Sequence, residues 1–347
     1  MELLPTEDLE HVLGRTRDLW EELRGQRLFI TGGTGFFGRW LLESLLWAND
    51  RLSLGLSALV LSRNPDAFRE KAPRVAGHPA IQFHPGDVRS FEFPKGGFSH
   101  IIHAATESSA RLNAEDPLTM FDTILDGTRR TLEFACHCGA GKFLLTSSGA
   151  VYGRQPPEMA RVPEDYAGAP DPIDSRSAYG EGKRAAETLC TLFSRQHGIE
   201  AKIARCFAFV GPHLPLDIHF AIGNFIRDGL KGGPIVVQGD GTPHRSYLYA
   251  ADLTIWLLTI LFRGHNGRSY NVGSEEGVSI AELAHLVAAS CGPEVAVIVR
   301  GKPDLSKAPE RYVPSTERAS RELGLVPWIS LPAAIARTIA FHRDAVA

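Results

Sequence analysis

Short apolar runs alternate with longer amphipathic segments over roughly the first two thirds of the chain. Segments of helical periodicity follow the first run and also span 121–138 and 179–196. Strands and helices in this alternation predict an α/β protein with a mostly parallel, doubly wound sheet. In such sheets ligands bind where the carboxyl ends of the strands converge. The runs expected to form the strands are 28–30, 57–61, 81–83, 100–103, 143–148 and 203–207.

The regular alternation stops after residue 210. We expect a helix over 220–230, a strand over 235–238, and further helices that begin near residues 253, 279, 316 and 331. Before the first strand, apolar residues from Leu9 to Leu23 recur at helical spacing and predict one amphipathic helix docked on the body. The chain is therefore expected to comprise a helical extension, a doubly wound domain and a smaller α/β lobe, over 1–25, 26–210 and 211–347.

Composition excludes several classes of protein. The net charge of the 347 residues is −3, so nothing indicates a nucleic acid or a membrane surface as partner. Five cysteines do not suggest a disulfide framework and fit a reducing compartment. No signal peptide and no apolar run of about 20 residues is found, so we expect a cytoplasmic protein. Cys136 and Cys138 lack a second ligand pair at suitable spacing, and no metal site is predicted.

A glycine array joins the first strand to the helix that follows it. Gly32, Gly35 and Gly38 form a G-x-x-G-x-x-G pattern between the two elements. Glycine permits a tight turn, and a pyrophosphate can approach the backbone where no Cβ intervenes. The helix N-terminus then offers unpaired N–H groups to the phosphates. This arrangement predicts a dinucleotide site.

The end of the second strand bears on the choice of cofactor. An acidic residue there would accept hydrogen bonds from the ribose 2′-hydroxyl of NAD and repel a 2′-phosphate. Ser62 and Arg63 occupy this position instead. NAD and NADP therefore both remain possible from the sequence.

A tyrosine and a lysine one helical turn apart suggest an acid–base pair. Tyr179 and Lys183 open a helix, and Ser148 ends the strand before the long loop 154–177. An ammonium near the tyrosine favours its phenolate, which can take the proton of a sugar hydroxyl while hydride leaves the same carbon. The Ser148 hydroxyl can orient the reacting oxygen. A loop as long as 154–177 is typical of a lid or binding loop.

The chain resembles the extended short-chain dehydrogenase/reductases that act on nucleotide sugars, from about residue 26 to residue 342. The matching motifs are the glycine loop 31–38, Gly86-Asp87-Val88, the strand end 147–153 and Tyr179 to Lys183. Two more segments, Gly239-Asp240-Gly241 with Arg245 and Arg311-Tyr312-Val313, look like those that bind the diphosphate of the substrate.

This resemblance implies a role for each matched residue. Ser148, Tyr179 and Lys183 would be catalytic, and Ser148, Asn224, Arg245 and Arg311 would bind a nucleotide-diphosphate sugar. The family is usually dimeric, so a homodimer is expected. The residues expected at the cofactor are Gly32, Thr34, Gly35, Phe36, Phe37, Gly38, Ser62, Arg63, Asp87, Val88, Ala104, Ala105, Thr146, Tyr179 and Lys183.

Several departures from the family pattern bear on the reaction. The 4,6-dehydratases typically have Asp and Glu after the active-site Ser/Thr, and the decarboxylases usually have Glu at the second position. Gly149 and Ala150 stand there in this chain. Ala208 and Ile124 also replace family asparagines, so the contacts of those asparagines do not transfer. The run 147–153 looks closest to that of 4-epimerases, in which small residues would leave space for the sugar to turn.

The first hypothesis is therefore a nucleotide-sugar epimerase with a transient 4-keto sugar. The alternatives are a 4,6-dehydratase or decarboxylase that takes its acid–base groups from Glu158, Glu164 or Asp165, or a 4-keto-sugar reductase using NADPH. A non-catalytic dinucleotide-binding protein is a fourth reading, against which the joint presence of Ser148, Tyr179 and Lys183 speaks.

Overall fold

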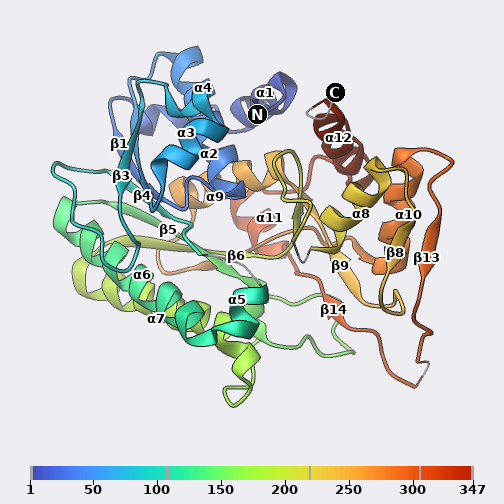
Figure 1. The fold of residues 1–347 in the computed structure, drawn as a ribbon. Coiled ribbons are helices and arrows are strands. Elements are labelled where there is room, and N and C mark those ends of the chain that lie inside the picture. Colours follow the sequence, from blue (N-terminus) through green and yellow to red (C-terminus); the bar gives the residue numbers. More distant parts are fainter. Residues whose placement is uncertain (1–2, 107–109, 219, 305, 345–347) are drawn as a thin grey trace.

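A seven-stranded parallel sheet forms the centre of the computed structural model (Figure 1). The structure describes residues 3–106, 110–218, 220–304 and 306–344. The strands are ordered β11-β6-β5-β4-β1-β2-β3, the doubly wound arrangement expected from the sequence. Their bounds are β1 Arg27–Thr31, β2 Ser57–Ser62, β3 Ile81–Pro85, β4 His100–His103, β5 Lys142–Ser148, β6 Glu200–Cys206 and β11 Ser269–Val272.

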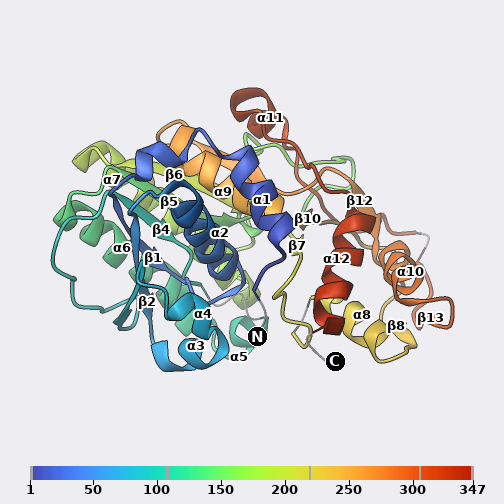
Figure 2. The ribbon, with the colours of Figure 1, turned by 90° about the horizontal axis from the view of Figure 1, so that it is seen from above.

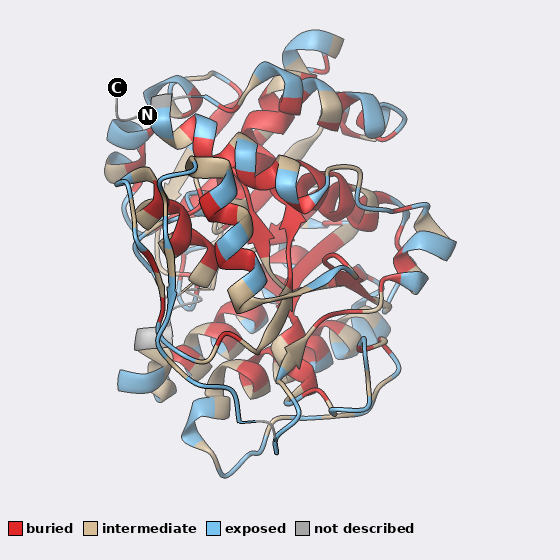
Figure 3. Ribbon diagram, turned by 90° about the vertical axis from the view of Figure 1, so that its right-hand side faces the viewer, coloured by how far each residue is buried: buried red, intermediate tan, exposed pale blue. Residues whose placement is uncertain are grey.

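Helices cover both faces of this sheet, which is why the central strands β1, β2 and β5 carry consecutive apolar residues rather than alternating ones. On β1, Leu28 and Ile30 belong to a core shared with α2 (Phe36–Leu52) and α9 (Ala250–Arg263). Phe29 between them belongs to the opposite core, with α6 (Pro117–Cys138) and α7 (Ala178–His197). Figure 3 shows the buried residues concentrated along the sheet and the inner faces of these helices.

Shorter elements connect these layers. Three helices are α3 Pro65–Lys71, α4 Pro73–Ala76 and α5 Ala110–Glu115, and two single-turn 3-10 segments are η2 Gly149–Tyr152 and η3 Ser175–Ser177. Among the described residues, none of the helices combines the length and hydrophobicity needed to cross a bilayer.

A smaller lobe from the C-terminal third lies beside the carboxyl ends of the strands (Figures 1 and 2). Its three-stranded sheet contains β12 Gly277–Ser279, β9 His244–Ser246 and β14 Arg311–Tyr312. Two-stranded pairs are formed by β10 Leu248–Tyr249 with β7 Phe209–Val210, and by β13 Val297–Val299 with β8 Ile235–Val237. The helices here are α8 Ala221–Leu230, α10 Ile280–Cys291, α11 Glu317–Leu323 and α12 Leu331–Asp344. Both β11 and α9 return to the central sheet, so that sheet includes chain from beyond residue 210.

The N-terminal region differs from its prediction as one continuous helix. It forms α1 (Thr6–Arg15) and a separate 3-10 turn, η1 (Trp20–Leu23). The interruption lies at Thr16, whose hydroxyl donates to the Val12 carbonyl at 2.6 Å and accepts from the Trp20 indole at 3.0 Å. Thr16 and Trp20 are both buried, so both side chains remain in the core although the helix is interrupted between them.

Candidate active site

The glycine loop between β1 and α2 is packed too closely for side chains at two of its positions. Gly32 has φ +72°, and a Cβ there would lie 2.4 Å from the carbonyl carbon of Ala104. A Cβ at Gly38 would lie 2.3 Å from the Cα of Gly33. Both glycines are therefore required, Gly32 by the contact of the loop with the segment that follows β4 and Gly38 by the contact of the loop with itself.

Gly35 differs, because its missing side chain would point into open space. Its φ is −87°, and the nearest heavy atom to an added Cβ is the Gly32 carbonyl oxygen, at an ordinary 3.5 Å. Gly35 is also the N-cap of α2, and no side chain caps this helix. Uncapped N–H groups above an unobstructed glycine suit a pyrophosphate, so the loop fits a dinucleotide. Thr34 is exposed beside it, and Phe36 and Phe37 are half-buried.

The ends of β2 and β3 lie side by side next to this loop. The buried Ser62 hydroxyl accepts a hydrogen bond from the Asn64 amide at 3.3 Å. Asp87 accepts two hydrogen bonds from the Arg89 guanidinium, at 2.9 and 3.1 Å, and these lower its pKa with help from the charge of Arg63. The positive charges of Arg89 and Arg63 therefore compensate the negative charge of Asp87 at this edge of the sheet. Val88 packs against Gly127, and a Cβ added at Gly127 would lie 2.9 Å from the Val88 side chain.

A histidine that the sequence analysis did not single out joins β1 to β4. His103 Nδ1 lies 2.7 Å from the Thr31 hydroxyl, and His103 Nε2 lies 3.1 Å from the Thr128 hydroxyl. Burial lowers the His103 pKa to about 3, so the ring is neutral. Thr31 also accepts from the Ala105 amide at 3.1 Å, which holds the Ala104–Ala105 segment against the glycine loop.

Ser148, Tyr179 and Lys183 are brought together at the carboxyl end of β5. Lys183 is buried, and its Nζ donates to the Thr106 hydroxyl and to the Thr146 carbonyl, each at 2.8 Å. The same Nζ lies 5.9 Å from the centroid of the Tyr179 ring. The sequence analysis did not identify Thr106 as a partner of Lys183. The only signal for it was its position shortly after β4.

The protonation of this pair is shifted by its surroundings. Burial raises the pKa of Tyr179 to about 12, and a hydrogen bond with Ser148 acts in the opposite direction. Burial lowers the pKa of Lys183 to about 8. Without ligands Tyr179 is therefore a neutral phenol at neutral pH, and positive charge brought close to it would favour its ionisation.

The space expected beside Ser148 is already filled. A Cβ at Gly149 would lie 2.7 Å from two carbons of the Phe207 ring and 2.7 Å from the Tyr312 hydroxyl. The expectation that a small residue at 149 leaves room for the sugar is therefore wrong at this position. Glycine at 149 instead lets two aromatic rings approach the strand end.

The three loop carboxylates suggested as substitute bases differ in burial. Glu158 and Asp165 are exposed. Glu164 is buried, and its carboxylate accepts from the backbone amide of Asn271 on β11 at 2.8 Å. Its second oxygen lies 3.8 Å from the Arg318 guanidinium. Burial raises the Glu164 pKa, but its contacts commit it to the edge of the sheet.

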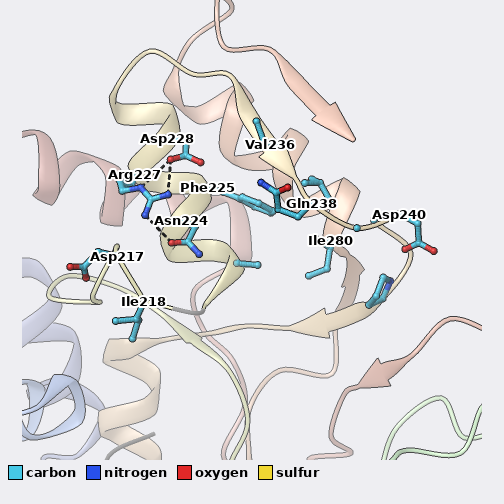
Figure 4. A pocket seen from close by; sticks show the side chains of 15 residues that line it. Asp217, Ile218, Asn224, Phe225, Arg227, Asp228, Val236, Gln238, Asp240 and Ile280 are labelled. Carbon is cyan, nitrogen blue, oxygen red and sulfur yellow. Dashed lines mark hydrogen bonds and ion pairs between the residues drawn. The ribbon is translucent and has the colours of Figure 1, made fainter. Parts of the chain in front are cut away.

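A pocket of about 690 Å³ opens in the smaller lobe, between α8 and the segment that follows β8 (Figure 4). Arg227 donates to Asp228 at 2.9 Å and to the side-chain oxygen of Asn224 at 3.1 Å, which leaves the Asn224 amide nitrogen available to a ligand. On the opposite wall Gln238 accepts from Arg300 at 3.0 Å, a pairing the sequence analysis missed. The lining residues are 217, 218, 221, 224, 225, 227, 228, 236–241, 243 and 280.

The two arginines expected to bind the diphosphate are on neighbouring strands but at different register positions. Arg245 on β9 pairs with Tyr312 on β14, and its guanidinium carbon lies 5.9 Å from the Tyr312 ring centroid. Arg311 pairs with His244, one position earlier. Because successive side chains alternate between faces of a strand, Arg311 lies on the opposite face from Arg245.

Comparisons with known proteins identify the family and the fold of this chain. A family model described as the NAD dependent epimerase/dehydratase family matches residues 28–273. UDP-glucuronic acid decarboxylase 3 of Arabidopsis thaliana is 32% identical over 306 residues, which are 88% of this chain and 85% of the relative. UDP-glucuronic acid decarboxylase 1 of Xenopus tropicalis is 29% identical, over 92% of this chain and 72% of the relative.

Solved structures share the fold at lower identity. UDP-glucose 4-epimerase of Thermotoga maritima, solved with UDP-glucose, has a TM-score of 0.76 and 20% identity, covering 92% of this chain and 100% of that chain. dTDP-glucose 4,6-dehydratase of Streptomyces venezuelae, solved with NAD, has a TM-score of 0.77 and 24% identity, with coverage of 92% and 97%.

Proposed function

Because the chain belongs to the NAD dependent epimerase/dehydratase family, we propose that it modifies the sugar of a nucleotide-diphosphate sugar by reversible oxidation at C4. Both the loop with an open Gly35 and the pocket in the smaller lobe support this proposal. The first would hold the dinucleotide, and the second the nucleotide half of the substrate. The division into a dinucleotide-binding part and a substrate lobe is part of the same proposal, as is a homodimer.

Each residue of the catalytic trio has a task in this scheme. When bound, NAD would accept hydride from C4 of the sugar and return it. Tyr179 takes the proton of the 4-hydroxyl, since it lies near Ser148 at the end of β5, whose hydroxyl lowers the Tyr179 pKa. Ser148 donates to the reacting oxygen, and Lys183 places a positive charge near both. Thr106 and Thr146 hold Lys183 in place for that purpose.

We propose epimerisation as the reaction, on the observation that no acid or base stands at 149 or 150. Elimination of water from the 4-keto sugar needs a base at C5 and an acid at C6. Gly149 and Ala150 offer neither, and Glu164 is committed to Asn271. Epimerisation needs only that the ketose turn and take hydride on its other face.

Decarboxylation of a nucleotide-linked uronic acid is the second candidate, favoured by the 32% identity to UDP-glucuronic acid decarboxylases over 88% of this chain. Oxidation at C4 makes the sugar a β-keto acid, which releases carbon dioxide without a base. The product must then be protonated at C5, and Ala150 cannot donate that proton. This requirement is the reason we place the candidate second.

A product assay separates the two. The purified protein is incubated with NAD and, in turn, with UDP-, dTDP-, GDP- and CDP-hexoses and with UDP-glucuronic acid, and the sugars are followed by NMR. We expect a C4 epimer and no loss of carbon from any sugar. Release of carbon dioxide with formation of a pentose would make decarboxylation the function, and accumulation of a 6-deoxy-4-keto sugar would reveal a dehydratase. The Tyr179→Phe variant is the matched inactive control.

A further inference from the structure

Ser148 lies between two tyrosine hydroxyls that come from different parts of the fold. Tyr179 on α7 is near enough to Ser148 for this hydroxyl to lower its pKa. The Tyr312 hydroxyl on β14, 164 positions later in the chain, lies 3.5 Å from Ser148 Oγ. The smaller lobe therefore contributes a polar group to the centre of the candidate active site.

The packing around Tyr312 holds this hydroxyl in place. Its ring lies against Phe207, with centroids 4.6 Å apart and planes inclined at 38°. The hydroxyl occupies the volume into which a side chain at 149 would project, since an added Cβ there would lie only 2.7 Å away. The Tyr312 phenol therefore fills the space beside Ser148 that a side chain at residue 149 would otherwise occupy.

Counting donors and acceptors on Ser148 suggests what this hydroxyl does. A serine oxygen accepts two hydrogen bonds and donates one. The Ala150 amide already donates to Ser148 Oγ at 3.1 Å. If Tyr312 donates the second, the single proton of Ser148 is left to donate to Tyr179 in the free protein and to the reacting sugar oxygen when substrate is bound. Burial raises the Tyr312 pKa well above that of a free phenol, so the group remains a neutral donor.

We propose that Tyr312 is a positioning residue for the reaction, whose hydroxyl donates to Ser148 and thereby directs the Ser148 proton at the reacting oxygen. This inference rests on the proposed function, because it assumes that a sugar hydroxyl reacts at Ser148 and Tyr179. Tyr312 keeps its own proton throughout. It acts from the smaller lobe, so correct placement of that lobe becomes a condition for turnover.

The kinetic test uses Tyr312→Phe, which removes one oxygen and keeps the ring against Phe207. We expect kcat to fall about tenfold, the scale of one hydrogen bond, with KM and the Kd for NAD unchanged. Combined with Ser148→Ala, Tyr312→Phe should cause no further loss, because its effect passes through Ser148. Multiplicative losses in the double variant, or a wild-type kcat in the single one, would overturn the proposal.

A second readout needs no substrate. Phenolate absorbance is titrated with pH, and the difference between each protein and its Tyr179→Phe counterpart reports Tyr179 alone. In Tyr312→Phe the Tyr179 pKa should rise, because the Ser148 proton is no longer directed at the Tyr179 oxygen and stabilises its phenolate less. Tyr166→Phe is the matched control and should leave the titration unchanged, since Tyr166 is linked to Phe207 through the Tyr152 ring, whereas Tyr312 contacts Phe207 directly.

The two readouts separate the two proposals. If wild-type protein turns over no nucleotide sugar, the proposed function fails, while the titration still tests the link from Tyr312 to Ser148. An unchanged Tyr179 titration in Tyr312→Phe would remove that link even from an active enzyme. Should Tyr312→Phe prove unfolded, Tyr312→His retains a ring with an N–H donor and is expected to give a partial shift in the same direction.

Discussion

Replacing Gly35 by alanine tests the cofactor site with the least disturbance of the fold. The φ of −87° at Gly35 is allowed to alanine, and the new Cβ would meet only the Gly32 carbonyl oxygen at 3.5 Å. The protein without cofactor should therefore fold normally. It should even gain about 0.4–1 kcal/mol, because alanine has fewer unfolded conformations than glycine.

The cofactor would meet a different situation, because the methyl group projects into the space above the uncapped start of α2. A pyrophosphate held off this surface loses its hydrogen bonds with the first N–H groups of the helix. Each such bond to a charged group contributes about 1.5–3 kcal/mol, so the loss of two weakens binding by at least about 3 kcal/mol, which is a rise in Kd of about 100-fold or more. The β-branched Gly35→Val should abolish binding.

Two further glycines make the comparison sharp. Gly14→Ala lies on α1, where an added Cβ meets nothing within 4 Å, so it should leave the affinity unchanged and raise Tm slightly, because alanine is the better helix former. Gly38→Ala would place its Cβ 2.3 Å from backbone and should lower the Tm of the free protein. Calorimetry gives Kd for NAD, and thermal unfolding without cofactor gives Tm. Wild-type affinity in Gly35→Ala, or a loss of Tm as large as that of Gly38→Ala, would refute the reasoning.

Three other outcomes follow from the same geometry. Tyr179→Phe should bind NAD normally and lose turnover by about 100-fold or more, measured under saturating substrate, whereas a wild-type rate would exclude it as acid–base group. Arg245→Leu should raise KM for the nucleotide sugar more than Arg311→Leu, since only Arg245 shares a strand face with Tyr312; equal KM values would count against this. Burial lowers the pKa values of His100 and His103 to about 4 and about 3, so folding stability is complete above pH about 6.5 and falls as pH drops toward these values. Each histidine contributes about 1.4 kcal/mol per pH unit to the slope of the unfolding free energy against pH. His100→Gln should remove the contribution of one histidine from this slope, measured by denaturant unfolding at several pH values.

Local features of this protein could be derived from the sequence alone. The glycine loop, the strand runs and the Tyr179–Lys183 spacing depend on backbone conformation and periodicity within a few residues. The parallel order of the sheet followed from the alternation of strands and helices, because connections of that length permit few topologies. The interrupted N-terminal helix was not foreseen, because the apolar residues from Leu9 to Leu23 keep helical spacing across the interruption.

Tertiary structure alone decided what surrounds Ser148. Gly149 by itself suggested an empty space, yet Phe207 and Tyr312 fill it from segments far away in the chain. In the same way, only the register of β9 with β14 separates Arg245 from Arg311. Sequence spacing determines which residues share one helix or strand, whereas a site built between two lobes depends on distances across the packed core, which no local pattern encodes.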